Sequence, residues 1–130
     1  MIVVDSSVWI GQLRNQSTEA VNRLDKIDDA GSIIVGDLVL FEVLQGARDD
    51  GHAQRIERNL RRFQFTTMLD DRTASLAAAN YRHLRGLGVT VRRSVDVLIA
   101  TYCIQNGHQL LHQDRDFRPF AEHLGLQLAL

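Results

Sequence analysis

The chain has 130 residues, a formal net charge of −1, and 45% hydrophobic against 24% charged residues, an ordinary balance for one globular domain without an overall field that attracts nucleic acid. Its single cysteine, Cys103, excludes an intramolecular disulfide and a zinc site built from several cysteines. Asp5 interrupts the first apolar run too early for a signal peptide, and no run is long enough to span a membrane, so we expect a cytoplasmic protein.

The first half of the chain alternates short apolar runs with longer amphipathic stretches, which is typical of a parallel α/β protein. Small hydroxyl residues and aspartates precede the amphipathic stretches, where they favour helix starts. The predicted elements are, in order, a strand over 1–4, a helix capped by Ser6 or Ser7 and ending near Leu13, a helix from Ser17 or Thr18 to about Gly31, a strand over 32–36, and a helix capped by Asp37 over 37–47.

The second half continues this alternation, with glycines at the expected helix ends. The predicted elements are, in order, a basic helix over 51–63, a weaker strand over 65–68, a helix from Asp70 or Asp71 to about Leu84, an apolar helix over 95–106, a strand over 108–113, a helix over 115–124 and a strand over 126–130.

Three of the strand runs, at 1–4, 32–35 and 109–111, have no polar residue at alternate positions. Continuous apolar runs of this length favour strands that are covered on both faces, as in a parallel sheet between helix layers. We therefore predict a single α/β domain over 1–130, with three α/β/α layers and a parallel, roughly five-stranded sheet.

Acidic residues recur where such a sheet places its ligand site, at the carboxyl ends of the strands. Asp5 follows the first predicted strand, and Asp114 and Asp116 follow the fourth; Glu42 and Asp96 lie in strongly apolar helices. Each has an ordinary explanation alone: Asp5 and Asp96 as helix caps, Glu42 as a solvent-facing residue, Asp114 and Asp116 as acids at a helix start. Only a shared site explains why all of them fall on the same side of the sheet.

Carboxylates that converge in one place repel one another and raise each other's pKa. A divalent cation removes this repulsion, and hard oxygen ligands suit Mg²⁺ or Mn²⁺. The five histidines show no zinc-binding spacing. The acids therefore predict a Mg²⁺ or Mn²⁺ site whose ion would activate water against a phosphoryl group.

The basic residues are almost all arginine: of 15 Lys and Arg residues, only Lys26 is lysine. Arg92 and Arg93 are adjacent, and the helix over 52–62 carries four arginines. Arginine binds phosphate through two parallel hydrogen bonds, so these are candidate phosphate contacts. A solvated helix face, or an arginine-rich codon bias, explains the pattern of 52–62 equally well.

Four segments of the chain resemble the PIN-domain family and, more narrowly, the VapC ribonuclease toxins of type II toxin–antitoxin systems. They are D-S-S-V-W-I from Asp5, L-V-L-F-E-V-L around Glu42, S-V-D-V-L-I-A around Asp96 and L-L-H-Q-D-R-D-F near the C-terminus. They occur in the family's order between residue 2 and about 120. The resemblance implies a parallel five-stranded sheet between helices and Mg²⁺- or Mn²⁺-dependent cleavage of RNA.

The resemblance also implies roles for individual residues. The family's acids correspond to Asp5, Glu42, Asp96 and Asp114, and Asp116 is an alternate for the last. These acids are expected to be catalytic, and the first four to hold the metal. The expected contacts to substrate are Ser6, Arg92, Arg93 and His112, of which His112 stands where many members have Thr or Ser.

The partners that the resemblance implies are an RNA substrate, a second copy in a homodimer, and a small antitoxin that blocks the site. The helices predicted over 17–30 and 37–47 carry more apolar residues than a lone domain needs, which favours a dimer or antitoxin groove. Ordinary core packing explains them as well.

Two other functions compete with the nuclease. A haloacid-dehalogenase-like phosphatase needs a second aspartate two positions after Asp5, where the chain has Ser7. A PIN-like module that binds protein or RNA without cleaving it remains open, and metal-dependent cleavage of RNA is the observation that separates it from the enzyme.

Overall fold

The computed structural model describes residues 1–130 and contains five strands and seven α-helices, matching the predicted fold class. Its elements, in chain order, are β1 (Ile2–Val4), α1 (Ser6–Leu13), α2 (Glu19–Asp25), the 3₁₀ turn η1 (Ala30–Ser32), β2 (Ile33–Gly36), α3 (Asp37–Gln45), α4 (Asp50–Leu60), β3 (Gln64–Thr66), α5 (Asp71–Gly86), α6 (Ser94–Asn106), β4 (Gln109–Leu111), the 3₁₀ turn η2 (Arg115–Phe117), α7 (Arg118–Leu124) and β5 (Gln127–Leu128).

The five strands form one parallel sheet in the order β3-β2-β1-β4-β5. The neighbours β1 and β4 end together, because Val4 pairs with Leu111 and the amide of Asp5 donates to the Leu111 carbonyl at 2.9 Å. The strands that are adjacent at the centre are therefore far apart in sequence. This strand order brings the segments after β1 and β4 to one edge of the sheet.

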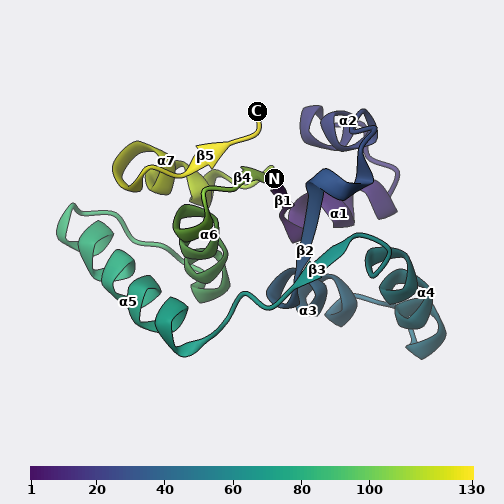
Figure 1. Ribbon diagram of the computed structural model, residues 1–130, viewed down its shortest axis with the longest axis horizontal. Coiled ribbons are helices and arrows are strands. Elements are labelled where there is room, and N and C mark those ends of the chain that lie inside the picture. The colour runs from purple at the N-terminus through teal and green to yellow at the C-terminus, as the bar shows by residue number, and fades with distance from the viewer.

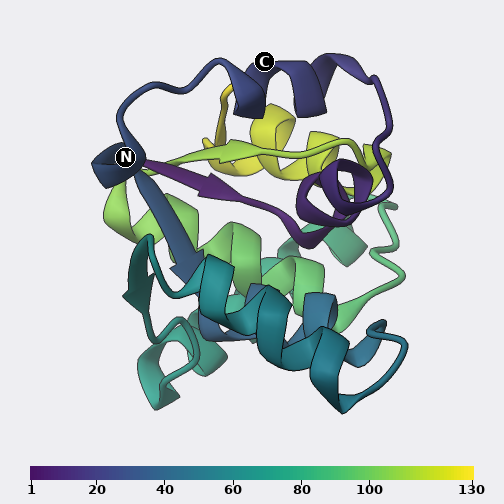
Figure 2. The same ribbon diagram turned by 90° about the vertical axis from the view of Figure 1, so that its right-hand side faces the viewer.

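Helices cover both faces of this sheet, as Figures 1 and 2 show. In Figure 1, α5, α6 and α7 lie to the left of the strands, and α1, α2 and α4 lie to the right. Because both faces are covered, β2 is wholly buried and the last two residues of β1 and of β4 are buried, which explains their apolar side chains; Gln109, at the start of β4, is exposed. No helix is both long and apolar enough to cross a membrane.

Two predicted helix caps were wrong. Neither Ser6 nor Ser7 caps α1, because Asp5 itself is the N-cap and its carboxylate accepts from the Ser7 amide. Asp37 is the first helical residue of α3, after the N-cap Gly36. Its carboxylate instead accepts from the amide of Met68, which ties the start of α3 to the segment after β3.

Two predicted helices were too long. The helix expected to reach Gly31 ends at Asp25, and a separate 3₁₀ turn over Ala30–Ser32 leads into β2. The helix expected over 115–124 begins as the 3₁₀ turn η2 and becomes α-helical at Arg118, directly before Pro119. Proline favours the first turn of an α-helix, where its missing N–H is not needed, so Pro119 marks the true start.

The core is apolar except for six polar or charged side chains. Two of them are satisfied within the helix layer: Thr73 donates to Gln105, and Thr101 accepts from Asn80. The other four are Asp5, Ser6, Glu42 and Asp96. Burial of three carboxylates in a domain of this size is costly unless they are compensated, so this group is the exceptional feature of the fold.

Gly36, at the end of β2, allows a close approach that any side chain would block. A Cβ at this position would overlap the side chain of Met68, which is 1% exposed. Met68 belongs to the segment after β3, and its side chain packs against the end of β2 at Gly36. The glycine therefore sets the packing beneath the first turn of α3, the helix that carries Glu42.

Gly36→Ala should lower the free energy of unfolding by about 1–3 kcal/mol, because the new methyl group overpacks the core against Met68. Urea denaturation measures the change. Gly86→Ala is the matched control: no atom lies within 4 Å of its Cβ position, so the free energy should stay the same or rise by up to about 1 kcal/mol. In a Met68→Ala background, Gly36→Ala should lower the free energy of unfolding by less. An equal loss in both backgrounds would contradict the overlap between the new methyl group and Met68.

Candidate metal centre

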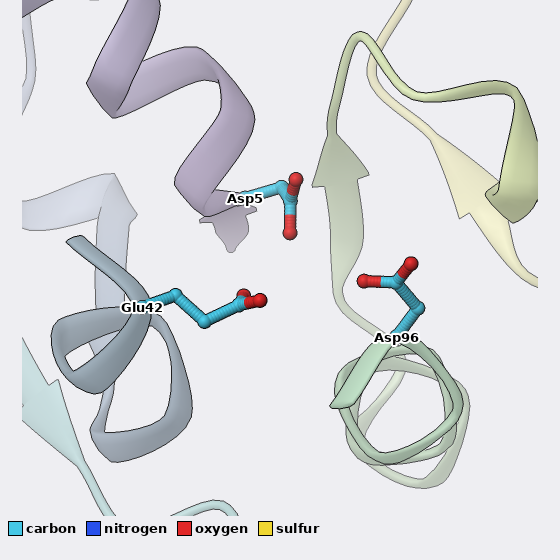
Figure 3. Close-up of side chains that lie close together, drawn as sticks. All are labelled: Asp5, Glu42 and Asp96. Atoms are coloured by element: carbon cyan, nitrogen blue, oxygen red, sulfur yellow. The ribbon is translucent and has the colours of Figure 1, made fainter. Parts of the chain in front are cut away.

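Three elements carry the buried carboxylates to one point. Asp5 follows β1 and caps α1, Glu42 lies in the second turn of α3, and Asp96 lies in the first turn of α6. Figure 3 shows the three side chains pointing toward one another, Asp5 and Glu42 from one side and Asp96 from the other. Their exposed fractions are 3%, 4% and 2%. One oxygen from each carboxylate lies within 4.8 Å of the others.

Asp5 uses its two oxygens differently. Oδ2 accepts from the amide of Ser7 at 3.1 Å and from the Ser7 hydroxyl at 2.6 Å, whereas Oδ1 is buried without a hydrogen-bond partner. The cap and the site are therefore one residue, and the two explanations of Asp5 in the sequence are not alternatives. From the sequence, Ser7 was expected only as a helix cap and not as a residue of the site; a hydroxyl two residues after a strand-ending aspartate is the signal that was available.

Glu42 faces inward and is 4% exposed, which excludes the alternative that it is an ordinary solvent-facing residue. It shares the buried face of α3 with Val39 and Val43. Its Oε1 accepts from the hydroxyl of Ser6 at 2.9 Å, and its Oε2 is ion-paired with Arg93. Ser6, expected at the substrate, thus holds Glu42 in place, and Arg93, expected at a phosphate, contacts the acid cluster itself.

Asp96 connects the buried cluster to a second group of acids. It is not a helix cap, because the N-cap of α6 is Arg93, and its Oδ2 is buried without a partner. Oxygens of Asp96, Asp114 and Asp116 also lie within 4.8 Å of one another. The structure thus brings together all five acids singled out in the sequence, with Asp96 common to both groups.

Asp114 and Asp116 are only partly buried and depend on one another. The Oδ1 of Asp114 accepts from the amide of Asp116 at 3.0 Å, as the cap of η2. Asp116 also pairs with Arg92 at 3.3 Å, through a side chain of Arg92 that is 79% exposed. Both acids therefore lie at the rim of the site.

Burial changes the acidity of this cluster. Loss of water raises the pKa of Asp5 to about 6, despite the hydrogen bonds from Ser7 that lower it. Burial and the charge of Asp5 raise the pKa of Asp96 to about 7, against the opposing effect of Arg93. The pKa of Arg93 is itself raised: partial burial lowers it, but Asp96, Glu42 and Asp5 together outweigh burial. The cluster thus carries more negative charge than its surroundings neutralise.

The donor set fits a hard divalent cation. Asp5 Oδ1 and Asp96 Oδ2 are buried, converge, and accept no hydrogen bond from the protein. Buried polar atoms are nearly always satisfied, so two orphaned carboxylate oxygens in one cluster indicate a ligand. Oxygen atoms at this spacing suit Mg²⁺ or Mn²⁺, and the cluster has no sulfur or imidazole that would favour zinc.

The remaining candidate residues lie outside the buried cluster. His112 accepts from the amide of Asp114 at 3.2 Å and packs against Phe117, so it supports the turn that carries the rim acids. No arginine of α4 pairs with a cluster acid; Arg61 instead pairs with Glu57 along the helix, as on a solvated face. Trp9 is 4% exposed and packs against Phe63, so it is a core residue.

The PIN-domain family profile matches residues 2–122. The chain belongs to the PIN-domain family. Within it the chain is VapC-like: it is 31% identical over 131 residues to ribonuclease VapC11 of Mycobacterium tuberculosis, covering 99% of this chain and 98% of the relative. The five acids and the strand order thus lie on a known nuclease scaffold.

Solved structures share the fold of this PIN domain at low identity. VapBC2 of Rickettsia felis, crystallised with a promoter DNA fragment, has a TM-score of 0.74 at 18% identity, covering 98% of this chain and 97% of that one. FitAcB of Neisseria gonorrhoeae has a TM-score of 0.74 at 18% identity, covering 98% and 96%. These similarities confirm the predicted three-layer fold.

Without divalent metal, the stability of this PIN domain should fall as the pH rises from 5 to 8. The folded-state pKa values of Asp5 (about 6) and Asp96 (about 7) exceed the ordinary value of 3.8. The folded protein therefore binds more protons than the unfolded chain in this window, and that advantage is lost as the acids ionise. Asp96→Asn should flatten the fall by about 1–3 kcal/mol, measured by urea denaturation in EDTA.

Asp71→Asn, at an exposed acid in the first turn of α5, is the control for this comparison and should leave the pH profile parallel to that of the wild type. If the free energy of unfolding falls equally steeply with pH in the wild type and in Asp96→Asn between pH 5 and 8, the pKa of Asp96 is not raised in the folded state.

Proposed function

We propose that this chain is a Mg²⁺- or Mn²⁺-dependent endoribonuclease that acts as the toxin of a toxin–antitoxin pair and inhibits translation and growth. The observation that carries the proposal is the buried triad of Asp5, Glu42 and Asp96, with two unpartnered oxygens, on a chain 31% identical along its length to a VapC ribonuclease. Because RNA is the proposed substrate, we place its action in the cytoplasm.

The triad would hold the ion, with Asp114 completing the ligand set from the rim. A divalent cation bound there supplies a Lewis acid for the phosphoryl oxygen and lowers the pKa of water. Ser6 and Ser7 fix the orientations of Glu42 and Asp5 through their hydroxyls. The rim carboxylate of Asp116 would accept the proton of the water that attacks the phosphodiester in line, while the P–O bond to the leaving ribose oxygen breaks and that oxygen takes up a proton.

The RNA strand has a candidate path beside the rim acids. A hollow of about 630 Å³ includes Asp114, His112 and Glu19 in its wall, together with Arg115 and Arg118. Neither arginine forms an ion pair with a carboxylate, so both are available to phosphates of the strand. We propose that this hollow and the arginines before α6, Arg92 and Arg93, flank the scissile phosphate from two sides.

Asp96→Asn should reduce cleavage of total RNA in Mg²⁺ or Mn²⁺ by at least about 10³-fold, because it removes an ionisable ligand at the centre of both acid groups. The fold should persist, since the amide has the shape of the acid. Gel analysis of RNA with purified protein, with and without EDTA, measures the change, and circular dichroism checks the fold.

Asp71→Asn serves as the control, because Asp71 lies on the exposed start of α5 and should retain full cleavage. Wild-type cleavage by Asp96→Asn would remove Asp96 from the mechanism. If the wild type cleaves no RNA at high concentration in either metal, the alternative of a non-catalytic binding module is favoured.

The proposed antitoxin has a candidate docking groove away from the acids. A hollow of about 490 Å³ between α1, the segment from α2 to β2, and α4 is lined mainly by apolar side chains. The indole N–H of Trp9 is buried in its wall without an acceptor. A segment that supplies apolar side chains and one carbonyl fits it, and the solved structures with this fold include a toxin–antitoxin complex from Klebsiella pneumoniae.

The proposed homodimer would use a different hollow, of about 440 Å³, between α5 and α6. It is lined by Leu69, Tyr81, Val97 and Leu98, with three alanines of α5. Leu69 is 42% exposed there, and a second copy that covers this surface would bury it.

Leu13→Asp should weaken binding of the antitoxin at least about tenfold, because it places a charge on the apolar lining beside α1. Titration calorimetry with the purified cognate antitoxin measures the affinity. Leu69→Asp is the matched control, since Leu13 and Leu69 are 47% and 42% exposed in different hollows. It should retain antitoxin affinity and instead lower the mass in light scattering toward 14.7 kDa. If Leu69→Asp weakens antitoxin binding and Leu13→Asp lowers the mass, the antitoxin binds the hollow between α5 and α6 and the dimer uses the other hollow.

A further inference from the structure

One positive charge reaches the buried acids. Arg93, directly before α6, pairs its guanidinium with Glu42 Oε2. No other lysine or arginine is ion-paired with Asp5, Glu42 or Asp96. The Arg93 side chain is 51% exposed, whereas that of Glu42 is 3% exposed. Arg93 thus extends from solvent to the edge of the triad and serves as its counter-ion.

This contact occupies the one triad carboxylate that has no free oxygen. Glu42 Oε1 accepts from Ser6 and Oε2 is held by Arg93, whereas Asp5 Oδ1 and Asp96 Oδ2 have no partner. A divalent cation at the triad can bind Asp5 and Asp96 at once. To bind Glu42 through Oε2 it must displace Arg93, because a guanidinium and a metal ion cannot share that oxygen closely without strong repulsion.

The half-exposed position of Arg93 gives the released side chain a second partner. The phosphate of a bound RNA must lie against the acid cluster to be cleaved, within the reach of an arginine at its rim. Guanidinium groups bind phosphate through paired, charge-assisted hydrogen bonds.

We propose that Arg93 is an exchangeable counter-ion, which holds Glu42 when no divalent cation is bound and transfers to the RNA phosphate when the cation takes Glu42. This inference rests on the proposed metal-dependent nuclease. It makes Arg93 a competitor of the metal and a partner of the substrate. Metal and RNA then strengthen each other's binding. The cation takes Glu42 and so frees Arg93 for the phosphate, and the phosphate takes Arg93 and so frees Glu42 for the cation. By linkage the coupling is reciprocal.

Titration calorimetry with Mn²⁺ alone tests the competition. Arg93→Ala should bind Mn²⁺ about 5–20-fold more tightly than the wild type, within the usual range of coupling between sites. Arg93→Lys, which keeps a charge but loses the planar guanidinium, should fall between them. In a Glu42→Gln background, the Arg93→Ala effect should disappear, because the carboxylate under competition has been removed.

Arg92→Ala is the matched control: it removes the same charge one residue away, from an arginine paired with Asp116 instead of Glu42. Its Mn²⁺ affinity should stay within about twofold of the wild type, since Arg92 is largely exposed and its charge is screened. An equal gain of Mn²⁺ affinity in Arg92→Ala and Arg93→Ala would show that the gain comes only from the change in net charge, and would overturn the exchange.

RNA binding in EDTA, where no cleavage occurs, tests the transfer. Glu42→Gln should bind a single-stranded RNA decamer about 5–10-fold more tightly than the wild type in fluorescence anisotropy, because Arg93 is released toward phosphate. In an Arg93→Ala background the same substitution should give little gain. An equal gain in both backgrounds would show that Glu42 merely repels RNA, and would overturn the transfer.

These outcomes separate the inference from the function beneath it. If the wild type takes up no Mn²⁺ at millimolar concentration, the proposed metal centre fails, whatever Arg93 does. If the wild type binds Mn²⁺ and folded Arg93→Ala binds it equally or more weakly, the metal centre stands and the exchange is overturned. Circular dichroism of each variant shows whether it is folded.

Discussion

The central constraint on this molecule is the burial of three carboxylates within one small cluster. Asp5, Glu42 and Asp96 are each less than 5% exposed, and each lies on a different element. Charges removed from water in this way destabilise a fold unless something compensates them. In this PIN domain the compensation is partial: hydroxyls from Ser6 and Ser7 and one guanidinium from Arg93. The residual negative charge makes the cluster a strong candidate for a divalent cation.

The parallel sheet is what makes this convergence possible. Because β1 lies between β2 and β4, the segments that follow these strands meet at one edge. Asp5 and Asp114 reach it as residues just after strands, and Glu42 reaches it from the helix that follows β2. Asp96 arrives independently, on the first turn of α6. The helices on both faces exclude water from this edge, and that exclusion raises the pKa values of Asp5 and Asp96.

The residues next to the acids hold the cluster in shape. Asp5 caps α1 with one oxygen and offers the other to the site, so the position of the helix and that of the ligand are coupled. Gly36 and Met68 set the packing at the start of α3, and Asp37 ties that start to Met68. At the rim, His112 supports the turn that carries Asp114. Changes in these supports should reach the site through the backbone.

The sequence by itself determined the fold class, the strand positions and all five acids. Continuous apolar runs identify buried strands, and charged residues after such runs, or inside apolar helices, are costly enough to require an explanation. The resemblance to VapC toxins placed the chain in the PIN-domain family, and the family comparisons agree on that membership. The exact helix ends were less certain, because caps and 3₁₀ turns depend on a few hydrogen bonds.

Only the tertiary structure decided which polar groups pair with one another. From the sequence, Ser6 or Ser7 was expected to cap α1 and Arg93 was expected at a phosphate. In the fold, Asp5 is the cap, Ser6 holds Glu42, and Arg93 pairs with Glu42. These pairings join residues that are 36 and 51 positions apart. Local sequence propensity cannot predict these pairings, because they form only when the sheet and α6 bring distant segments within hydrogen-bonding distance.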